Sequence, residues 1–107
     1  MGKDALRGTL DLLILKTLAR GPDHGYGITC SILNASQNQL RVEEGSLYPA
    51  LRRMEIDGLV KAEWKKTENN RRARYYRLTK AGEKAIAAAV ESWREHTAAV
   101  SGFLESI

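Results

Sequence analysis

The hydrophobic residues of this chain change their spacing twice, and these two changes limit the folds that it can adopt. Up to Gly58 the apolar residues recur every three or four positions, which is typical of helices. Between residues 59 and 79 they alternate with polar residues, which is typical of half-buried strands. After Thr79 the helical spacing returns. The sequence therefore predicts helices, then a β-hairpin, then one more helix.

Three helices are expected before the hairpin. The first covers roughly residues 5–20, where leucine and isoleucine recur at four-residue spacing and spread most of the way round the helix. Thr9 is its candidate N-cap, and Gly21–Pro22 ends it. A helix with so many apolar sides has to be covered by more than one neighbouring element.

The second and third helices are joined by a polar connector. The second follows a turn at residues 23–27 and ends near residues 36–39. The third covers residues 45–57, with Ser46 as its N-cap. Pro49 is expected in the first turn of this helix, because an amide there has no intrahelical partner to lose.

The alternating segment predicts a β-hairpin. Its strands are residues 59–65 and 73–79, and the polar turn between them contains a pair of asparagines. On the first strand one side consists of Val60, Ala62 and Trp64. The hairpin ends in a basic tip, which holds Lys65, Lys66, Arg71, Arg72 and Arg74.

Positive charge is concentrated around this hairpin. Residues 61–80 hold eight basic and two acidic side chains, a net charge of +6. By contrast, residues 1–60 are neutral overall and residues 81–107 carry a net charge of −2. A charge cluster is commonly a solvated loop, and it indicates a nucleic-acid site only when the surrounding fold supports one.

The last helix is expected from Lys80 to about Ser106, with Thr79 as its N-cap. At 1.5 Å per residue it is roughly 40 Å long, which is too long for such a small domain to cover. Its apolar residues follow spacings of four and three, the seam of paired helices. The seam consists of Ile86, Val90, Trp93, Thr97, Val100, Leu104 and Ile107. The alternative is a helix packed on its own domain, whose stripe would look similar.

The seam predicts a homodimer and divides the chain in two. Residues 1–79 would form the folded domain, and residues 80–107 the dimerisation helix. The first helix is apolar enough to contribute to the same interface through Leu10 and Leu13. The expected contacts from the last helix are Ile86, Val90, Trp93, Thr97, Val100 and Leu104.

Three helices followed by a β-hairpin form a winged helix-turn-helix, so the predicted fold is mainly α with a small hairpin and a long C-terminal helix. In helix-turn-helix proteins the second of the two turn-linked helices enters the major groove of double-stranded DNA. The hairpin, as the wing, would contact phosphates. The expected DNA contacts are Tyr26, Ser46, Tyr48, Pro49, Arg52, Arg53, Lys65, Lys66, Arg71, Arg72 and Arg74.

Some of these contacts have alternatives. Tyr48 could pack on the domain surface, and Tyr26, at the start of the second helix, could pack in the core. Arg52 and Arg53 are adjacent and therefore point about 100° apart. One of them can face the groove, while the other is exposed or pairs with an acid such as Glu55 or Asp57.

Four segments resemble the PadR family of transcriptional regulators, and they occur in order over nearly the whole chain. They are residues 24–28 (HGYGI), 44–55 (EGSLYPALRRME), 58–60 (GLV) and 72–82 (RARYYRLTKAG). Residues 43–46 and 68–72 are similar to the acidobacterial-type subgroup, and the single C-terminal helix is similar to the short subfamily. The resemblance implies a cytoplasmic homodimer that represses transcription until a small molecule releases it. The two-fold symmetry of such a dimer predicts a palindromic operator.

No motif in the chain predicts an enzyme, a cofactor or a metal site. His24 and His96 have no ligand partner three or four residues away, and Cys30 has no disulfide partner. No stretch approaches 18 apolar residues, so no membrane span is expected. A single cysteine without an export signal fits the reducing cytosol. The rival function is a winged helix that docks an acidic protein partner through its basic hairpin.

Trp93 and Thr97 are candidate effector-binding residues. An indole is larger than the aliphatic residues that usually fill a seam, and its N–H needs a partner. Beside the small Thr97, two Trp93 rings related by symmetry could hold a gap for a flat aromatic compound. The alternative is that Trp93 fills the core by packing on Leu10 or Leu13.

Overall fold

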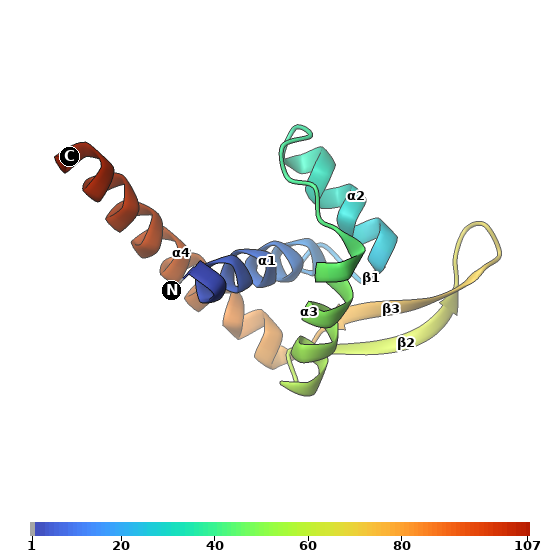
Figure 1. Cartoon of the computed structure of the whole chain (residues 1–107). Coiled ribbons are helices and arrows are strands. Elements are labelled where there is room, and N and C mark those ends of the chain that lie inside the picture. The colour runs from blue at the N-terminus through green and yellow to red at the C-terminus, as the bar shows by residue number, and fades with distance from the viewer. Residues whose placement is uncertain (1) are drawn as a thin grey trace.

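The order of elements follows the two changes of hydrophobic spacing, with one short strand added (Figure 1). The computed structural model describes the backbone of residues 2–107 and the side chains of residues 8–107. The elements are α1 (Gly2–Leu18), β1 (Asp23–His24), α2 (Gly25–Ala35), α3 (Glu44–Ile56), β2 (Val60–Lys66), β3 (Arg72–Leu78) and α4 (Lys80–Ser106). The predicted fold class, mainly α with a small antiparallel sheet, is confirmed.

The core forms where α1, α2, α3 and the sheet meet. Its fully buried side chains are Ile14, Ile28, Leu47, Leu51, Met54 and Val60. Leu10, Leu13 and Ile86 are half-buried and pack against this core. We predicted these three residues for the dimer interface; part of their apolar surface is already buried within one chain, and their contact in a dimer stays a prediction.

The hairpin has the register that its alternation predicts, and a third strand joins it. Val60 pairs with Leu78 at one end and Lys66 with Arg72 at the other. β1 pairs with β3 on the opposite side, so that the strand order is β1-β3-β2. The sequence predicted only a turn at residues 23–27, since a strand of two residues is too short to show alternation.

The predicted N-caps of the first and third helices are wrong. α1 already begins at Gly2, so Thr9 lies inside the helix and does not cap it. Glu43 is the N-cap of α3 and Ser46 lies in the first turn, which moves Pro49 into the second turn. The missing amide of Pro49 leaves the carbonyl of Gly45 without its helical partner, and exposure of Gly45 lets water replace it.

Two other helix ends match the sequence. Gly58, at φ +78°, donates its amide to the Glu55 carbonyl, and Leu59 donates to that of Met54. This paired arrangement is the usual glycine ending of a helix. Thr79 caps α4, where its hydroxyl accepts a hydrogen bond from the Gly82 amide at 3.0 Å.

α4 packs on α1 with its first half and leaves the body of the domain with its second half (Figure 1). The molecule consequently extends 54 Å along its longest axis. The protruding half exposes Val100, Phe103, Leu104 and Ile107. Gly102 does not end the helix, which continues to Ser106.

Gly82→Ala should destabilise the fold, because a Cβ at this position would collide with the Leu59 carbonyl oxygen in the turn that joins α3 to β2. We expect a loss of about 1–3 kcal/mol in the free energy of unfolding, as for overpacked cores. Urea denaturation followed by circular dichroism measures it. Gly102→Ala, in the same helix with nothing within 4 Å, is the control and should stabilise by about 0.5–1 kcal/mol. Equal effects at both positions would contradict the close approach.

Candidate nucleic-acid interface

α3 presents one apolar and one polar side, as its 3.6-residue period requires. The buried side consists of Leu47, Ala50, Leu51 and Met54. The exposed residues include Ser46, Tyr48, Pro49 and Arg52. These four predicted contact residues are therefore accessible on the helix that a helix-turn-helix protein uses for DNA.

Tyr48 packs on the start of α2 while part of its ring stays exposed. Its exposed fraction is 45%. A Cβ added at Gly25 would collide with the hydroxyl and ring carbons of Tyr48, so the tyrosine lies directly on the backbone there. Tyr48 therefore packs on the domain surface, as the alternative stated. The exposed part of its ring remains accessible to a ligand.

Arg53 is held within the protein. Its guanidinium donates two hydrogen bonds to the Asp11 carboxylate of α1, at 2.7 and 3.0 Å. The hydrogen bond with Asp11 raises the pKa of Arg53, against a smaller opposing effect of burial. The predicted DNA contact of Arg53 is therefore corrected to an ion pair that ties α3 to α1. The sequence suggested a nearby acid such as Glu55, and only the packing of two helices brings Asp11 into reach.

The wing exposes four of its five predicted cations, which are Lys65, Lys66, Arg71 and Arg72. Arg74 differs, because it donates a hydrogen bond to Glu55 of α3 at 2.9 Å and lies over the Tyr76 ring. Arg74 is thus corrected from a phosphate contact to a link between the wing and α3. The strands carry it close to the body of the domain, where an acid is available.

Trp64 is a surface residue of the wing, which the sequence analysis missed. Its exposed fraction is 59%, although it alternates with the buried Val60. Trp64 pairs with Arg74, nearer the tip. The guanidinium of Arg72 lies 5.3 Å from the centre of the Trp64 ring. An indole under this guanidinium favours an extended orientation of the arginine along the hairpin.

The start of α2 connects α3 to the wing. His24 caps α2, since its Nδ1 accepts a hydrogen bond from the Gly27 amide at 3.1 Å. Its ring packs edge-on against Tyr75 of β3, with centroids 5.1 Å apart, and the ammonium of Lys65 lies 5.8 Å from the Tyr75 ring centre. Tyr48, Gly25, His24, Tyr75 and Lys65 therefore form one chain of contacts, here named the connecting strip.

Tyr26 borders this strip and is not a core residue. Its exposed fraction is 73%, so the core-packing alternative is wrong. Hydrogen bonding with the Cys30 thiol raises the pKa of the Tyr26 hydroxyl. Tyr26 lies in the first turn of α2, the end of a helix that favours anions.

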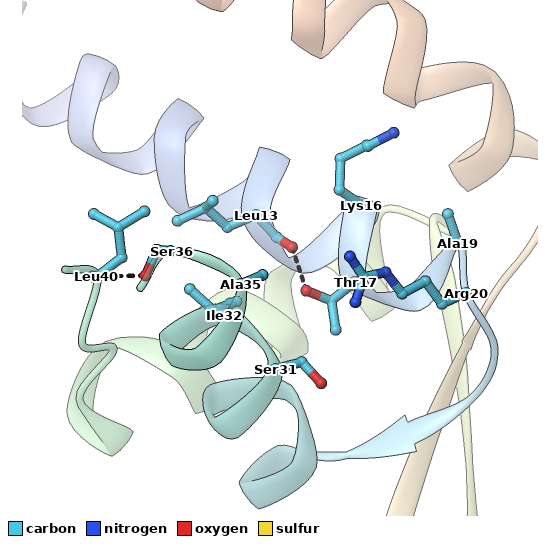
Figure 2. A pocket seen from close by; sticks show the side chains of 10 residues that line it. All are labelled: Leu13, Lys16, Thr17, Ala19, Arg20, Ser31, Ile32, Ala35, Ser36 and Leu40. Atoms are coloured by element: carbon cyan, nitrogen blue, oxygen red, sulfur yellow. Dashed lines mark hydrogen bonds between the residues drawn. The ribbon is translucent and has the colours of Figure 1, made fainter. Parts of the chain in front are cut away.

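Two hollows of about 420 Å³ each lie away from this surface. The first separates α1 from α2 and is shown in Figure 2. Leu13, Ile32 and Leu40 supply its apolar lining, and the Thr17 hydroxyl is bonded to the Leu13 carbonyl at 2.8 Å. Its charged side chains are Lys16 and Arg20.

The second hollow separates α1 from α4. Its lining is Gly8, Thr9, Asp11, Leu15, Leu59, Ala85, Ala89, Ser92, Trp93 and His96. Trp93 is 43% exposed and faces this hollow, so it does not fill the core. Thr97 is half-buried and does not line the hollow, which removes the basis for its predicted effector contact within one chain.

Within residues 8–107, no three side chains of His, Cys, Asp or Glu come together as a metal site. None of the helices described is both long and apolar enough to cross a membrane. The accessible polar chemistry of these residues is instead that of cations, hydroxyls and aromatic rings. Such groups bind anionic partners, above all phosphate esters.

Comparison with known proteins identifies the family. The profile described as "Transcriptional regulator PadR-like family" matches residues 14–88, well over half of the chain. The chain belongs to the PadR-like family of transcriptional regulators. This PadR-like protein is 38% identical to a transcriptional regulator of Mycobacterium tuberculosis over 75% of this chain and 71% of that protein. It is accordingly a regulator and not an enzyme, as expected.

Solved structures agree with this membership. A transcriptional regulator from Clostridium thermocellum superposes with a TM-score of 0.82 and 31% identity, over 94% of this chain and 97% of that one. Bacillus subtilis PadR, solved in complex with operator DNA, superposes with a TM-score of 0.66 over 76% of this chain and 46% of that one. At 21% identity the latter shows a shared fold.

Gly25→Ala should destabilise this PadR-like protein only while Tyr48 is present. The added methyl group has to displace the Tyr48 ring, at a cost of about 1–3 kcal/mol in the free energy of unfolding. In the Tyr48→Ala background the same change should cost less than about half as much, because contacting residues are energetically coupled. Urea denaturation of the four proteins gives the coupling. Additive effects would show that the two residues do not touch.

Proposed function

We propose that this PadR-like protein binds operator DNA as a cytoplasmic repressor, with α3 in the major groove and the wing on the phosphate backbone. The observation that carries the proposal is the connecting strip. Through successive contacts from Tyr48 to Lys65 it ties the exposed side of α3 to the cationic wing. A protein of the same fold, Bacillus subtilis PadR, was solved on operator DNA, which supports this use of the surface.

α3 and the wing would make different kinds of contact with DNA. Ser46 and Arg52 lie on the exposed side of α3 and would read base edges. Lys66, Arg71 and Arg72 of the wing would neutralise phosphates, and Tyr26 would donate to a phosphate at the start of α2. The rival function, docking of an acidic protein, does not explain a polar, accessible α3.

Arg72→Ala should weaken binding to all DNA sequences alike and lower the salt slope of log K by about 0.9, the loss of one phosphate contact. Arg52→Ala should instead reduce the preference for a selected duplex over a random one by about 1–3 kcal/mol. Fluorescence anisotropy at several salt concentrations measures both. Lys84→Ala, an exposed cation on α4, is the control for lost net charge. If Lys84→Ala and Arg72→Ala change the slope equally, the wing makes no specific phosphate contact.

We further propose that the protein is a homodimer through α4. The second half of this helix exposes Val100, Phe103 and Leu104, which the side chains described for residues 8–107 leave uncovered. Val90 and Trp93 continue the same seam toward the body of the domain. A two-fold dimer would present two α3 helices, so a palindromic operator with half-sites about one DNA turn, roughly 34 Å, apart is expected.

The double variant Val100→Glu/Leu104→Glu should be a monomer, because four buried like charges would face one another across the two-fold axis. Analytical ultracentrifugation of the full-length chain measures the change. Ala98→Glu, an exposed position outside the seam, is the control and should remain dimeric. A double variant that still sediments as the dimer would rule out this seam.

The α1–α4 hollow is the place that we propose for a small aromatic effector. Its volume is about 420 Å³, and Trp93 presents a partly exposed indole to it. In a dimer the exposed remainder of Trp93 would lie near the Trp93 of the second copy, as the position in the seam suggests. An effector there would change the separation of the two α3 helices and so their affinity for DNA.

A further inference from the structure

Asp11 takes part in the ion pair with Arg53 and also lines the α1–α4 hollow. Its carboxylate accepts both hydrogen bonds from Arg53, in the last turn of α3. The same residue lines the α1–α4 hollow together with Trp93. Its side chain is 22% exposed and that of Arg53 is 30% exposed, so the pair is accessible from outside. A molecule in the hollow therefore meets the residue that holds the DNA-facing helix.

We propose that the Asp11–Arg53 pair is a charge latch, through which an organic cation in the α1–α4 hollow releases Arg53 and alters α3. The cation would compete with the guanidinium for one carboxylate. This inference rests on the proposed effector role of the hollow, and it adds the charge of the ligand and the route of regulation.

The lining of the hollow favours a positive charge. Among the lining residues whose side chains are described, Asp11 is the one formally charged at neutral pH, and the others are mainly apolar or uncharged. An indole face such as that of Trp93 also attracts cations when they lie within about 6 Å of the ring. An anion would meet the Asp11 carboxylate unfavourably, and a neutral aromatic compound would gain from the indole but not from the carboxylate.

Release of Arg53 would act on α3 in two ways. α3 would lose its bidentate connection to α1, which fixes the helix across a separation of 42 residues in the chain. The guanidinium of Arg53 would also become free at the end of α3, beside the Asp57 carboxylate that already interacts with it. Both changes alter how α3 meets DNA, and thermodynamic linkage requires that DNA and the cation affect each other's binding equally.

The test compares a cation with its neutral analogue in the absence of DNA. N-methylquinolinium and quinoline share a ring system and differ in charge. Calorimetry gives their affinities, and quenching of Trp93 in a Trp64→Phe protein locates them at the hollow. We expect Asp11→Asn to weaken binding of the cation, and Arg53→Met to tighten it because Asp11 becomes free. Each change should be about two- to fivefold, the range of partly exposed ion pairs. Quinoline binding should not change.

Matched variants separate the latch from general charge effects and from misfolding. Glu91→Gln removes an exposed carboxylate from α4, and Arg20→Met removes an exposed guanidinium from the turn after α1, both outside this hollow. Neither should alter cation binding. Asp11→Glu keeps the charge and should keep the preference for the cation. If Asp11→Asn unfolds, Arg53→Met still decides, because Asp11 remains in place.

The outcomes distinguish the latch from the effector site. Saturable binding of both compounds that is the same in wild type, Asp11→Asn and Arg53→Met would overturn the latch and leave the hollow as an effector site. Absence of saturable binding and of Trp93 quenching by either compound would overturn both. The DNA-binding proposal is judged separately, by the wing and α3 variants. Opposite shifts for Asp11→Asn and Arg53→Met, confined to the cation, support the latch.

Discussion

The whole structure depends on the burial of α1. Its Ile14, Leu15 and Leu18 are almost completely inaccessible, and α2, α3, α4 and β3 all contact this helix. Apolar burial contributes about 25 cal/mol per Å² and has no preferred direction, so a helix that is apolar on several sides draws neighbours onto each of them. α3, which faces DNA in our proposal, and α4, which protrudes for pairing, therefore take their orientation from one common support.

Some basic side chains form ion pairs that join elements of the fold, and others remain exposed on the wing. Arg53 and Arg74 find carboxylates, Asp11 and Glu55, because packing brings acids beside them. The cations at the tip of the wing extend beyond the acidic residues of the body and stay exposed, and Arg72 lies over Trp64. Basic side chains thus have two roles: Arg53 and Arg74 hold α3 in place, and the exposed cations of the wing are available to phosphates.

Much of the architecture was predictable because it is encoded locally. The cap at Thr79, the end at Gly58 and the alternation from Val60 are signals within a few residues, and the corresponding elements were predicted closely. The errors arose where local signals compete. Thr9 and Ser46 are good caps by type, yet α1 already begins at Gly2 and α3 at Glu44. The strand β1 exists only because β3 lies beside it.

By itself, the sequence determined the periods of the helices and strands, the basic hairpin, the exposed polar side of α3 and the family. These depend on neighbours along the chain, whose geometry is set by helix and strand periods. Only the tertiary structure decided which acids pair with Arg53 and Arg74. The packing of Tyr48 on Gly25, the exposure of Trp64 and the hollow beside Trp93 likewise follow from it. Those contacts join residues far apart in the chain, and their distances follow from how side chains of several elements share one core.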